Sequence, residues 1–518
     1  MKKVSLLALG FVMACNTTQK TVSEAPKTTV AADPVPFAET ITQADLKEYL
    51  YTYASDEFEG RETGKPGQKK AVEYLKAFYT SHGIAAAQSN GDYFQEVPLE
   101  VSKVPEGSVT INGTSFPLGE DIITFSSAQG AYTEVVFVGY GVEEGDYSDY
   151  NGLDVDGKLV LIKSGEPMNA DGTYVISGTS ENSAWGNMSE GMGKKSELAV
   201  EKGAKGVLYL DEQNFARYKG YFNYMKNNDS GRMELAAQHN DNMLFVLDEK
   251  AAKAIKSDIT EATKSISVPV NLNLNVTSGN EKLSSENVAA IIKGTEKPDE
   301  YVIISSHLDH IGITGNGEIN NGADDDGSGT VSVLEIAQAF KKAADAGHGP
   351  KRSVIFLHVT GEEKGLLGSM YYTDVDPIVP LSETVVDLNI DMIGRIDPNY
   401  KGARNYLYLI GSDKLSTELH NLSEDINKKY TNIEFDYTYN DENDPNRFYY
   451  RSDHYNFAKN NIPIIFYFNG THADYHRPSD TPDKINYDLM ENRARLIFYT
   501  AWEIANLDHR LVVDKASE

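Results

Sequence analysis

Apolar positions along the chain follow two periodicities, and their alternation predicts the fold class. Short runs rich in β-branched residues are typical of buried strands, and apolar residues three and four positions apart are typical of helices. Predicted strands cover residues 287–293, 301–306, 353–360, 383–390 and 462–468, and predicted helices cover residues 331–344, 415–429 and 487–507. This order indicates an α/β domain with a mainly parallel or mixed central sheet and helices on both faces.

The first half of the chain has two further textures. Helical spacing at residues 41–54 and 67–82 flanks a polar loop, SDEFEGRETGKPGQ. Residues 133–269 instead carry short predicted strands, Gly-rich turns and one helix at 194–202, which indicates a small α/β domain inserted into the first. We therefore expect the main domain to comprise residues 38–132 and 270–518, with the insert at 133–269.

The N-terminus reads as a targeting segment. Two lysines precede the apolar stretch Val4–Met13, which is too short to span a bilayer. The segment closes on Val-Met-Ala-Cys, which resembles a bacterial lipobox, and a plain secretory signal with an incidental cysteine is the alternative. We expect residues 1–15 to be a lipoprotein signal that ends at a lipidated Cys15, and residues 16–37 to be a flexible tether. Asn16 rather than aspartate follows the cysteine, which by resemblance to lipoproteins favours the outer membrane.

Composition narrows the function classes. The chain has 518 residues, enough for two or three domains, and a net charge of −29 with a pI near 4.8. Such acidity argues against binding to a nucleic-acid backbone. Cys15 is the sole cysteine, so an internal disulfide and a thiolate metal site are excluded. Any metal must be held by histidines and carboxylates.

The candidate chemistry begins where the strand at 301–306 ends on His307-Leu308-Asp309. Sites in open α/β sheets collect at the carboxyl ends of strands. The triplet Asp324-Asp325-Asp326 follows, and adjacent carboxylates repel one another unless a cation or hydrogen bonds compensate. An acidic surface turn is the alternative for the triplet taken alone, but the histidine and aspartate just upstream favour metal.

Three later strands also end in candidate ligands, namely Glu362 with Glu363, Asp391 and His476. Together with the first group they form a mixed nitrogen and oxygen set that suits zinc. Two metals about 3.5–4 Å apart need a bridging carboxylate, plus one histidine and one carboxylate each. The set supplies that number with one glutamate to spare, and a free carboxylate beside a metal site is what a hydrolytic general base requires.

At this point the chain resembles a known family, the co-catalytic dizinc exopeptidases. That family includes secreted bacterial aminopeptidases, glutamate carboxypeptidase and the transferrin receptor. The matching motifs, in the expected order, are SSHLDHIG, NNGADDDGSGT, GEEKGLLGS, NIDMIGR, RSDHYNFAKNNIPIIF and DYHRPSDTPDKI. The SDEFEGRETG loop is also similar to the family's, and residues 133–269 resemble its protease-associated (PA) insert.

The resemblance implies a role for each candidate residue. His307 and Asp391 would bind one zinc ion, Glu363 and His476 the other, and Asp325 would bridge the two. Glu362 would be the general base, Asp309 would orient His307, and Tyr475 and His454 would lie beside the reacting carbonyl. The peptide bond between Asp325 and Asp326 is expected to be cis.

The expected function is metal-dependent hydrolysis of N-terminal residues from peptides, with two zinc ions per chain. A carboxypeptidase or a glutaminyl cyclase on the same scaffold is the alternative, although no clear counterpart exists for the arginine cluster of glutamate carboxypeptidase. A non-enzymatic receptor is disfavoured because every ligand position is filled. No nucleic acid is expected as a partner, and contact with a membrane is expected only through the lipid anchor.

Overall fold

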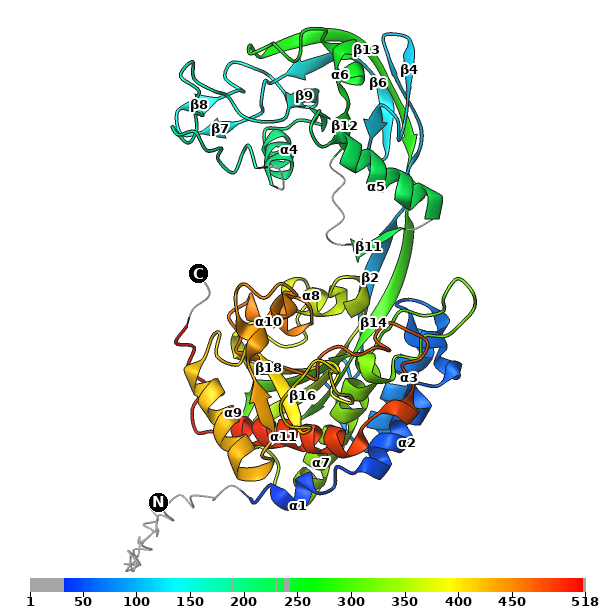
Figure 1. Cartoon of the computed structure of the whole chain (residues 1–518), viewed down its shortest axis with the longest axis vertical. Helices are drawn as coiled ribbons and strands as arrows, with labels where there is room; N and C mark the ends of the chain where they lie inside the picture. The colour runs from blue at the N-terminus through cyan, green and yellow to red at the C-terminus, as the bar shows by residue number, and fades with distance from the viewer. Residues whose placement is uncertain (1–31, 188–189, 229–230, 237–242, 516–518) are drawn as a thin grey trace, which may run out of the picture. The chain divides into compact units, whose positions relative to one another are not determined.

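The computed structural model describes residues 32–187, 190–228, 231–236 and 243–515 (Figure 1). The predicted leader and Cys15 lie outside the described residues. The compact body begins at Pro34. None of its described helices combines the length and the apolar character needed to cross a membrane.

Helices and strands alternate through most of the described chain. The helices are α1 (Val35–Ala38), α2 (Gln43–Tyr53), α3 (Pro66–Ser81), α4 (Gly191–Glu201), α5 (Phe215–Asn228), α6 (Glu249–Ile255), α7 (Gly329–Asp345), α8 (Leu367–Asp374), α9 (Thr417–Tyr430), α10 (His454–Ala458) and α11 (Tyr487–Asn506). The strands of the larger sheet are β1 (Ala85–Ala86), β2 (Phe94–Ser102), β11 (Arg232–Leu235), β14 (Glu281–Ile292), β15 (Lys297–His307), β16 (Arg352–Val359), β17 (Thr384–Ile390), β18 (Tyr406–Ile410), β19 (Glu434–Asp436) and β20 (Ile464–Phe468).

This larger sheet is mixed, as the sequence predicted. Its order is β11-β2-β14-β16-β15-β17-β20-β18-β19, with β1 paired to β14. The central strands β16, β15, β17 and β20 are parallel to their neighbours in this group. Strands β14 and β18 flank them in antiparallel orientation. The parallel centre brings the carboxyl ends of its strands to one edge of the sheet.

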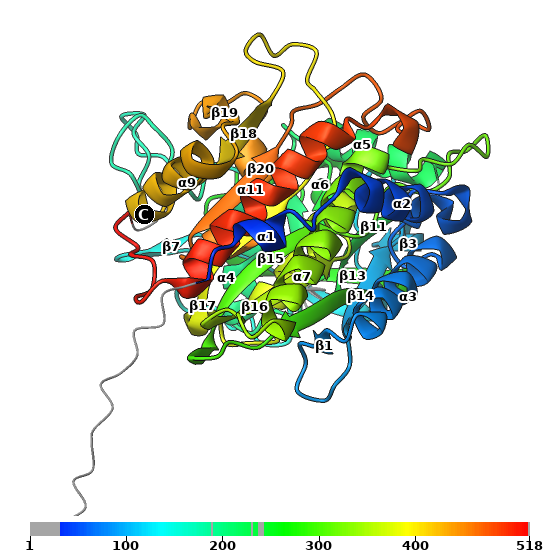
Figure 2. The same cartoon turned by 90° about the horizontal axis from the view of Figure 1, so that it is seen from below.

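Burial explains why the central strands form. Every residue of β16, β17 and β20 is buried, which matches their mainly apolar sequences rich in Val, Ile, Leu and Phe. Figure 2 shows α7 and α11 side by side across one face of this sheet, with α1 and α2 next to them. Helices α8 and α10 cover the other face, where Tyr372 and Phe457 pack against Ile303 and Ile355. Helices on both faces confirm the predicted layers.

A second sheet holds most of the remaining strands. Its order is β4-β3-β13-β6-β9-β10-β12-β5. These strands are β3 (Glu106–Ile111), β4 (Thr114–Pro117), β5 (Ile122–Ile123), β6 (Ala128–Phe137), β9 (Leu159–Lys163), β10 (Gly206–Leu210), β12 (Met243–Leu247) and β13 (Ile266–Thr277), while β7 (Glu143–Glu144) and β8 (Tyr147–Ser148) pair separately. The expected boundaries at residues 133 and 269 fall inside β6 and β13, because strand pairing carries this sheet from Glu106 to Thr277.

The tether was predicted to extend too far. Residues 35–37 belong to α1, where the Phe37 ring lies 5.8 Å from the Trp502 ring. Arg495 secures the following turn by donating to the backbone oxygens of Ala38 and Ile41. Aromatic packing and these hydrogen bonds therefore order the chain from α1 onward.

Candidate metal centre

The loops that follow the parallel strands carry the predicted ligands. Because the carboxyl ends of these strands meet at one sheet edge, the loops converge there. His307 closes β15, Glu362 and Glu363 follow β16, Asp391 follows β17, His476 follows β20, and Asp325 lies in the turn that precedes α7.

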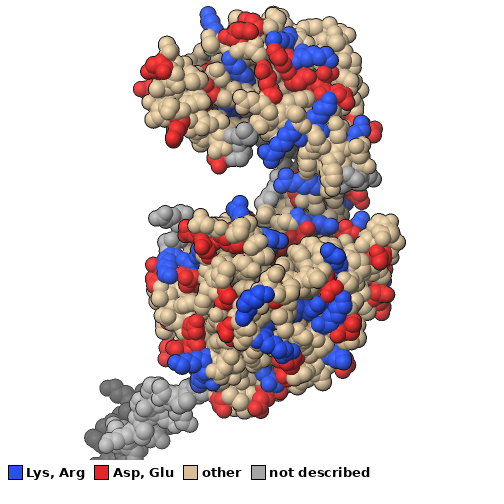
Figure 3. Space-filling view, viewed as in Figure 1, with Lys and Arg blue, Asp and Glu red and all other residues tan. Residues whose placement is uncertain are grey.

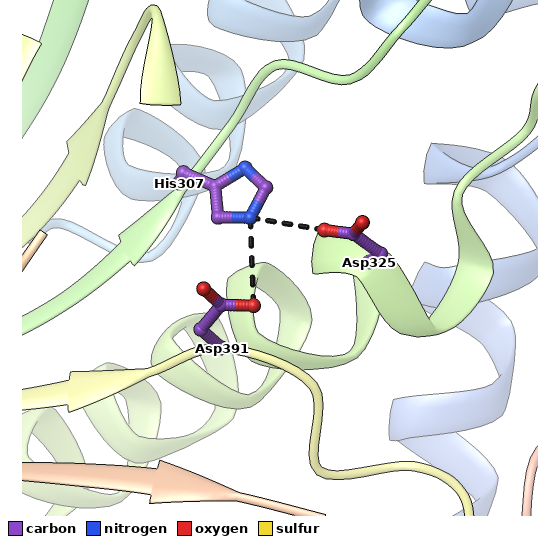
Figure 4. A group of neighbouring side chains, drawn as sticks. All are labelled: His307, Asp325 and Asp391. Carbon is purple, nitrogen blue, oxygen red and sulfur yellow. Dashed lines mark ion pairs between the residues drawn. The ribbon is translucent and has the colours of Figure 1, made fainter. Parts of the chain in front are cut away.

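The first group contains His307, Asp325 and Asp391, whose ligand atoms lie within reach of one cation (Figure 4). Nε2 of His307 is 3.1 Å from Oδ1 of Asp325 and 3.6 Å from Oδ1 of Asp391. All these side chains are buried. Figure 4 shows the imidazole edge turned toward both carboxylates.

The second group shares Asp325 with the first. Nε2 of His476 lies 3.0 Å from Oδ2 of Asp325 and 3.2 Å from Oε2 of Glu363. The two oxygens of Asp325 thus face different histidines, as a bridging carboxylate requires. A third imidazole, that of His310, forms with Asp325 and Glu363 a group whose ligand atoms also lie within reach of one cation, and its Nδ1 is 2.8 Å from Oε1 of Glu363.

The two neighbours of Asp325 in the triplet, Asp324 and Asp326, instead accept hydrogen bonds, mainly from backbone amides. Asp324 accepts hydrogen bonds from the Gly394 amide and from the Asn469 side chain. Asp326 accepts from the amides of His307 and Met392, and so ties two ligand-bearing segments together. The peptide bond between Asp325 and Asp326 is cis, as expected.

The donor set fits a pair of cations. Nε2 of His307 is buried and has no hydrogen-bond partner among the described residues, although it lies between two carboxylates. Burial lowers the pKa of His307, but the charges of Asp391 and Glu362 outweigh it and hold that pKa well above 6.5. In the same way Asp325 and Glu363 overcome burial to raise the pKa of His476 to about 10. The carboxylates of the cluster therefore favour positive charge beside them, and divalent ions would supply that charge.

Glu362 lies beside the cluster without joining either group. Burial raises its pKa well above 4.5, and the neighbouring charges of Glu363 and Asp391 add to the shift. Its amide donates to Oδ1 of Asp309 at 3.2 Å. The main chain thus fixes the start of this turn and leaves the Glu362 carboxyl at the site.

Asp309 lies beside His307, but the contact differs from the expected one. Nδ1 of His307 donates to the backbone oxygen of Asp309 at 3.1 Å, whereas the carboxylate is 3.9 Å away. That carboxylate accepts from the Thr63 hydroxyl at 2.6 Å and from the Glu362 amide. Asp309 therefore orients His307 through its main chain and connects the N-terminal loop to the Glu362 turn through its side chain.

Tyr475 and His454 occupy different environments. The Tyr475 ring stacks on His476 at 3.9 Å and lines a cavity together with Glu362. His454 does not line that cavity. Its Nε2 contacts the backbone oxygen of Tyr449 at 2.8 Å and its ring packs on Phe466, while burial lowers its pKa to about 3. The geometry thus gives His454 a packing role behind the cavity wall.

The cavity opens directly beside the carboxylates of the cluster. Its wall away from the cluster is mainly apolar and aromatic, with a single arginine. The lining residues are Asp325, Glu362, Asp391, Met392, Phe448, Arg451, Phe466, Phe468, Thr471 and Tyr475. We refer to the part lined by Met392, Phe448, Phe466 and Phe468 as the side-chain pocket.

Several supporting residues were not singled out from the sequence. Ser452 donates to Oδ2 of Asp391 at 2.6 Å, although the two lie far apart in the chain. Arg61 is buried and donates to the backbone oxygens of Leu308, Asn321 and Gly322, so that the SDEFEGRETG loop braces the segments of both ligand groups. His310 is the second histidine of the SSHLDHIG motif, and that position was its only signal in the sequence.

Comparison with known proteins agrees with this geometry. Residues 287–501 match peptidase family M28. The "probable leucine aminopeptidase 2" of Aspergillus oryzae is 27% identical over 417 residues, which cover 74% of this chain and 69% of the relative. A "probable glutamate carboxypeptidase" of Arabidopsis thaliana is 37% identical over 106 residues, or 20% of this chain and 14% of the relative.

Among solved structures, the aminopeptidase from Aneurinibacillus sp. strain AM-1 is 18% identical. The match covers 94% of this chain and 99% of that chain, with a TM-score of 0.47. The family match covers every residue of the two ligand groups and the adjacent glutamate. Residues 287–501 of this chain are therefore similar to peptidase family M28.

Proposed function

We propose that the protein is a zinc-dependent aminopeptidase that removes apolar residues from the N-termini of peptides. The observation that carries the proposal is Asp325, whose two oxygens face two separate ligand groups, with Glu362 beside them. Two zinc ions bound there would polarise the scissile carbonyl and increase the acidity of water. The aminopeptidase relatives support this activity for the chain.

Glu362 has the position and the proton affinity of a general base. Burial first, and then the charges of Glu363 and Asp391, raise the pKa of Glu362, so this pocket disfavours a further negative charge. Cations on the neighbouring ligands would offset that repulsion and leave Glu362 able to accept a proton from the attacking water. The same carboxyl group would then deliver the proton to the leaving amine. Tyr475, which lines the same cavity, would bind the carbonyl oxygen of the substrate.

The side-chain pocket indicates which residue is removed. Met392, Phe448, Phe466 and Phe468 offer an apolar surface next to the cluster. An apolar residue such as leucine would gain about 1.5–3 kcal/mol by leaving water there. We therefore expect Leu, Met or Phe at the N-terminus of good substrates, and poor cleavage after Asp or Glu.

One observation favours a carboxypeptidase as the second candidate. Arg451 lines the cavity, and a guanidinium can pair with a C-terminal carboxylate. The aminopeptidase relative, however, matches 74% of this chain, whereas the carboxypeptidase relative matches 20%. This difference supports the aminopeptidase as the first candidate.

Blocked peptides distinguish the two candidates. The test uses a leucyl peptide in four forms, with the N-terminus free or acetylated and the C-terminus free or amidated. The proposal expects hydrolysis to be abolished by acetylation, unaffected by amidation, and lost with a zinc chelator. Loss of hydrolysis on amidation alone would instead establish the carboxypeptidase.

We further propose that the enzyme is a lipoprotein of the bacterial cell envelope, anchored through Cys15 and carrying a PA-type insert. The support is the lipobox-like Val-Met-Ala-Cys sequence and the absence of any other cysteine. Such an anchor would hold the peptidase domain at the outer membrane, where it would meet soluble peptides. Cys15 belongs to a segment that the described structure does not include.

A further inference from the structure

His310 lies deep in the second ligand group, and the proposed mechanism does not use it. Its side chain is fully buried. Nδ1 is 2.8 Å from Oε1 of Glu363 and 3.8 Å from Oδ2 of Asp325. The ring also meets the His476 ring edge-on at 5.7 Å.

The surrounding main chain holds this imidazole in place. The His310 amide donates to the backbone oxygen of Arg61, and the Gly312 amide donates to that of Gly60. Gly322 packs against the ring, where a Cβ atom would lie only 2.6 Å from Cδ2 of His310. The N-terminal loop and Gly322 therefore hold the ring from the protein side.

The carboxylates of Asp391 and Glu363, which do not bridge the two cation positions, have similar surroundings. Oδ1 of Asp391 faces His307, and Oδ2 accepts a hydrogen bond from Ser452 at 2.6 Å. Oε2 of Glu363 faces His476, and Oε1 faces His310. In each case one oxygen points to the cation position and a protein group lies close to the other. The Ser452 contact is a hydrogen bond, whereas the His310 imidazole lies 2.8 Å from Oε1 of Glu363 without a hydrogen bond of regular geometry. Such outer contacts orient a ligand and raise its affinity for metal.

We propose that His310 is a positioning residue of the second cation site, holding Oε1 of Glu363 so that Oε2 is presented to zinc. The inference rests on the proposed two-zinc function, and it assigns a separate positioning residue to each zinc site. Ser452 serves the first site through Asp391, and His310 serves the second through Glu363. The matched pair makes a selective test possible.

The test measures zinc affinity rather than catalysis. Metal-free protein is titrated with zinc against a chromophoric chelator, and His476→Ala identifies the dissociation constant that belongs to the second site. His310→Ala should weaken that constant about 10–100-fold, the range seen for outer contacts of metal ligands. The other constant should change less than about threefold, and His310→Asn should recover part of the loss because its amide can still donate.

Two control variants make the expected pattern specific. Ser452→Ala should give the mirror image, with weaker binding at the first site only. His358→Asn should lower the melting temperature without separating the two constants, because His358 is a buried histidine bonded to Tyr79 and Ser306. Unchanged constants in His310→Ala, or equal weakening of both, would overturn the proposal. A loss as large as that in His476→Ala would also overturn it, since His310 would then be a ligand. None of these outcomes depends on whether the protein cleaves peptides.

Discussion

At the residue scale, the proposed two-zinc site depends most on Asp325. Its two oxygens lie 3.1 Å from His307 and 3.0 Å from His476, so its charge is shared by both cation positions. Asp325→Asn keeps the shape but removes that charge. Bound zinc should fall from about two ions per chain toward none. Elemental analysis after gel filtration measures this.

Asp324→Asn is the matched control for that variant. Asp324 is the adjacent buried carboxylate, and its oxygens accept from Gly394, Asn469 and His472 rather than facing the cations. The control should retain both zinc ions while losing stability. Full zinc occupancy in Asp325→Asn would contradict the bridging role.

The adjacent glutamates should fail in different ways. Glu362→Gln removes the proton acceptor but none of the cation ligands, so turnover should fall about 10²–10⁴-fold with zinc content unchanged. Glu363→Gln should instead lose the zinc of the second group, because Glu363 faces His476. Parallel measurement of turnover and metal content separates the two effects. Retention of most activity in Glu362→Gln would mean that the two glutamates exchange roles.

At the scale of elements, the contact between α2 and α7 predicts a pH dependence of stability. Glu335 on α7 is buried and accepts from the Thr42 amide that precedes α2. Burial raises the pKa of Glu335 from 4.5 to about 7. The folded protein therefore keeps a proton that the unfolded chain releases between these values, so this stabilising contribution is complete below pH 4.5 and is lost as pH rises to 7.

Glu335→Gln should remove that loss, because a neutral amide has no charge to bury. The variant should match the parent near pH 4.5 and exceed its free energy of unfolding at pH 8 by on the order of 1–3 kcal/mol. Urea unfolding at the two pH values provides the measurement. A variant that is equally stable or less stable at pH 8 would show that Glu335 is ionised at no cost in the folded protein.

Elements with uniform burial were the ones that the sequence predicted well. Each residue of β16, β17 and β20 is buried, so their apolar runs marked them clearly. In contrast, β13 alternates exposed and buried positions, and asparagines and Pro269 obscure its pattern. Strand β2 contains Pro98 and charged residues, and it too escaped the pattern. Missing β13 misplaced the end of the second sheet, whereas β2 belongs to the larger sheet.

The ligand set was predictable for a related reason. Residues that follow parallel strands must meet at one edge, so residue type and position were sufficient to group His307, Asp391 and His476 with one of the two adjacent glutamates. The choice of Glu363 rested on the family resemblance. The contacts that orient these ligands come from distant segments. Ser452 reaches Asp391, and Thr63 reaches Asp309, only after the chain has folded. No spacing in the sequence encodes such pairs.

At the scale of the whole molecule, the chain is strongly acidic. On the face shown in Figure 3, acidic and basic side chains are interspersed among the described residues. The net charge of −29 keeps such a protein soluble and gives no basic field for nucleic acid.

Zinc should contribute to stability as well as to catalysis. An ion that binds only the folded state adds about 2.7 kcal/mol when its free concentration is 100 times the dissociation constant. Chelation should therefore lower the melting temperature reversibly, and re-addition of zinc should restore it. Asp325→Asn should be insensitive to the chelator. An equal response in both proteins would place the stabilising metal elsewhere.

The proposed anchor predicts where the protein is found. Cys15→Ser should leave the enzyme soluble or unprocessed but active, because Cys15 is remote in sequence from every ligand. A lipoprotein with several acyl chains, by comparison, stays firmly on a membrane. Cell fractionation with an activity assay tests this. A Cys15→Ser protein that remains membrane-bound after leader cleavage would refute the anchor.

Anomalous diffraction at the zinc edge tests directly whether Asp325 bridges two zinc ions. In crystals of the zinc-loaded protein, the account predicts two peaks about 3.5–4 Å apart. One should lie among His307, Asp325 and Asp391, and the other among Asp325, Glu363 and His476. A single peak, or two peaks that do not share Asp325, would contradict it.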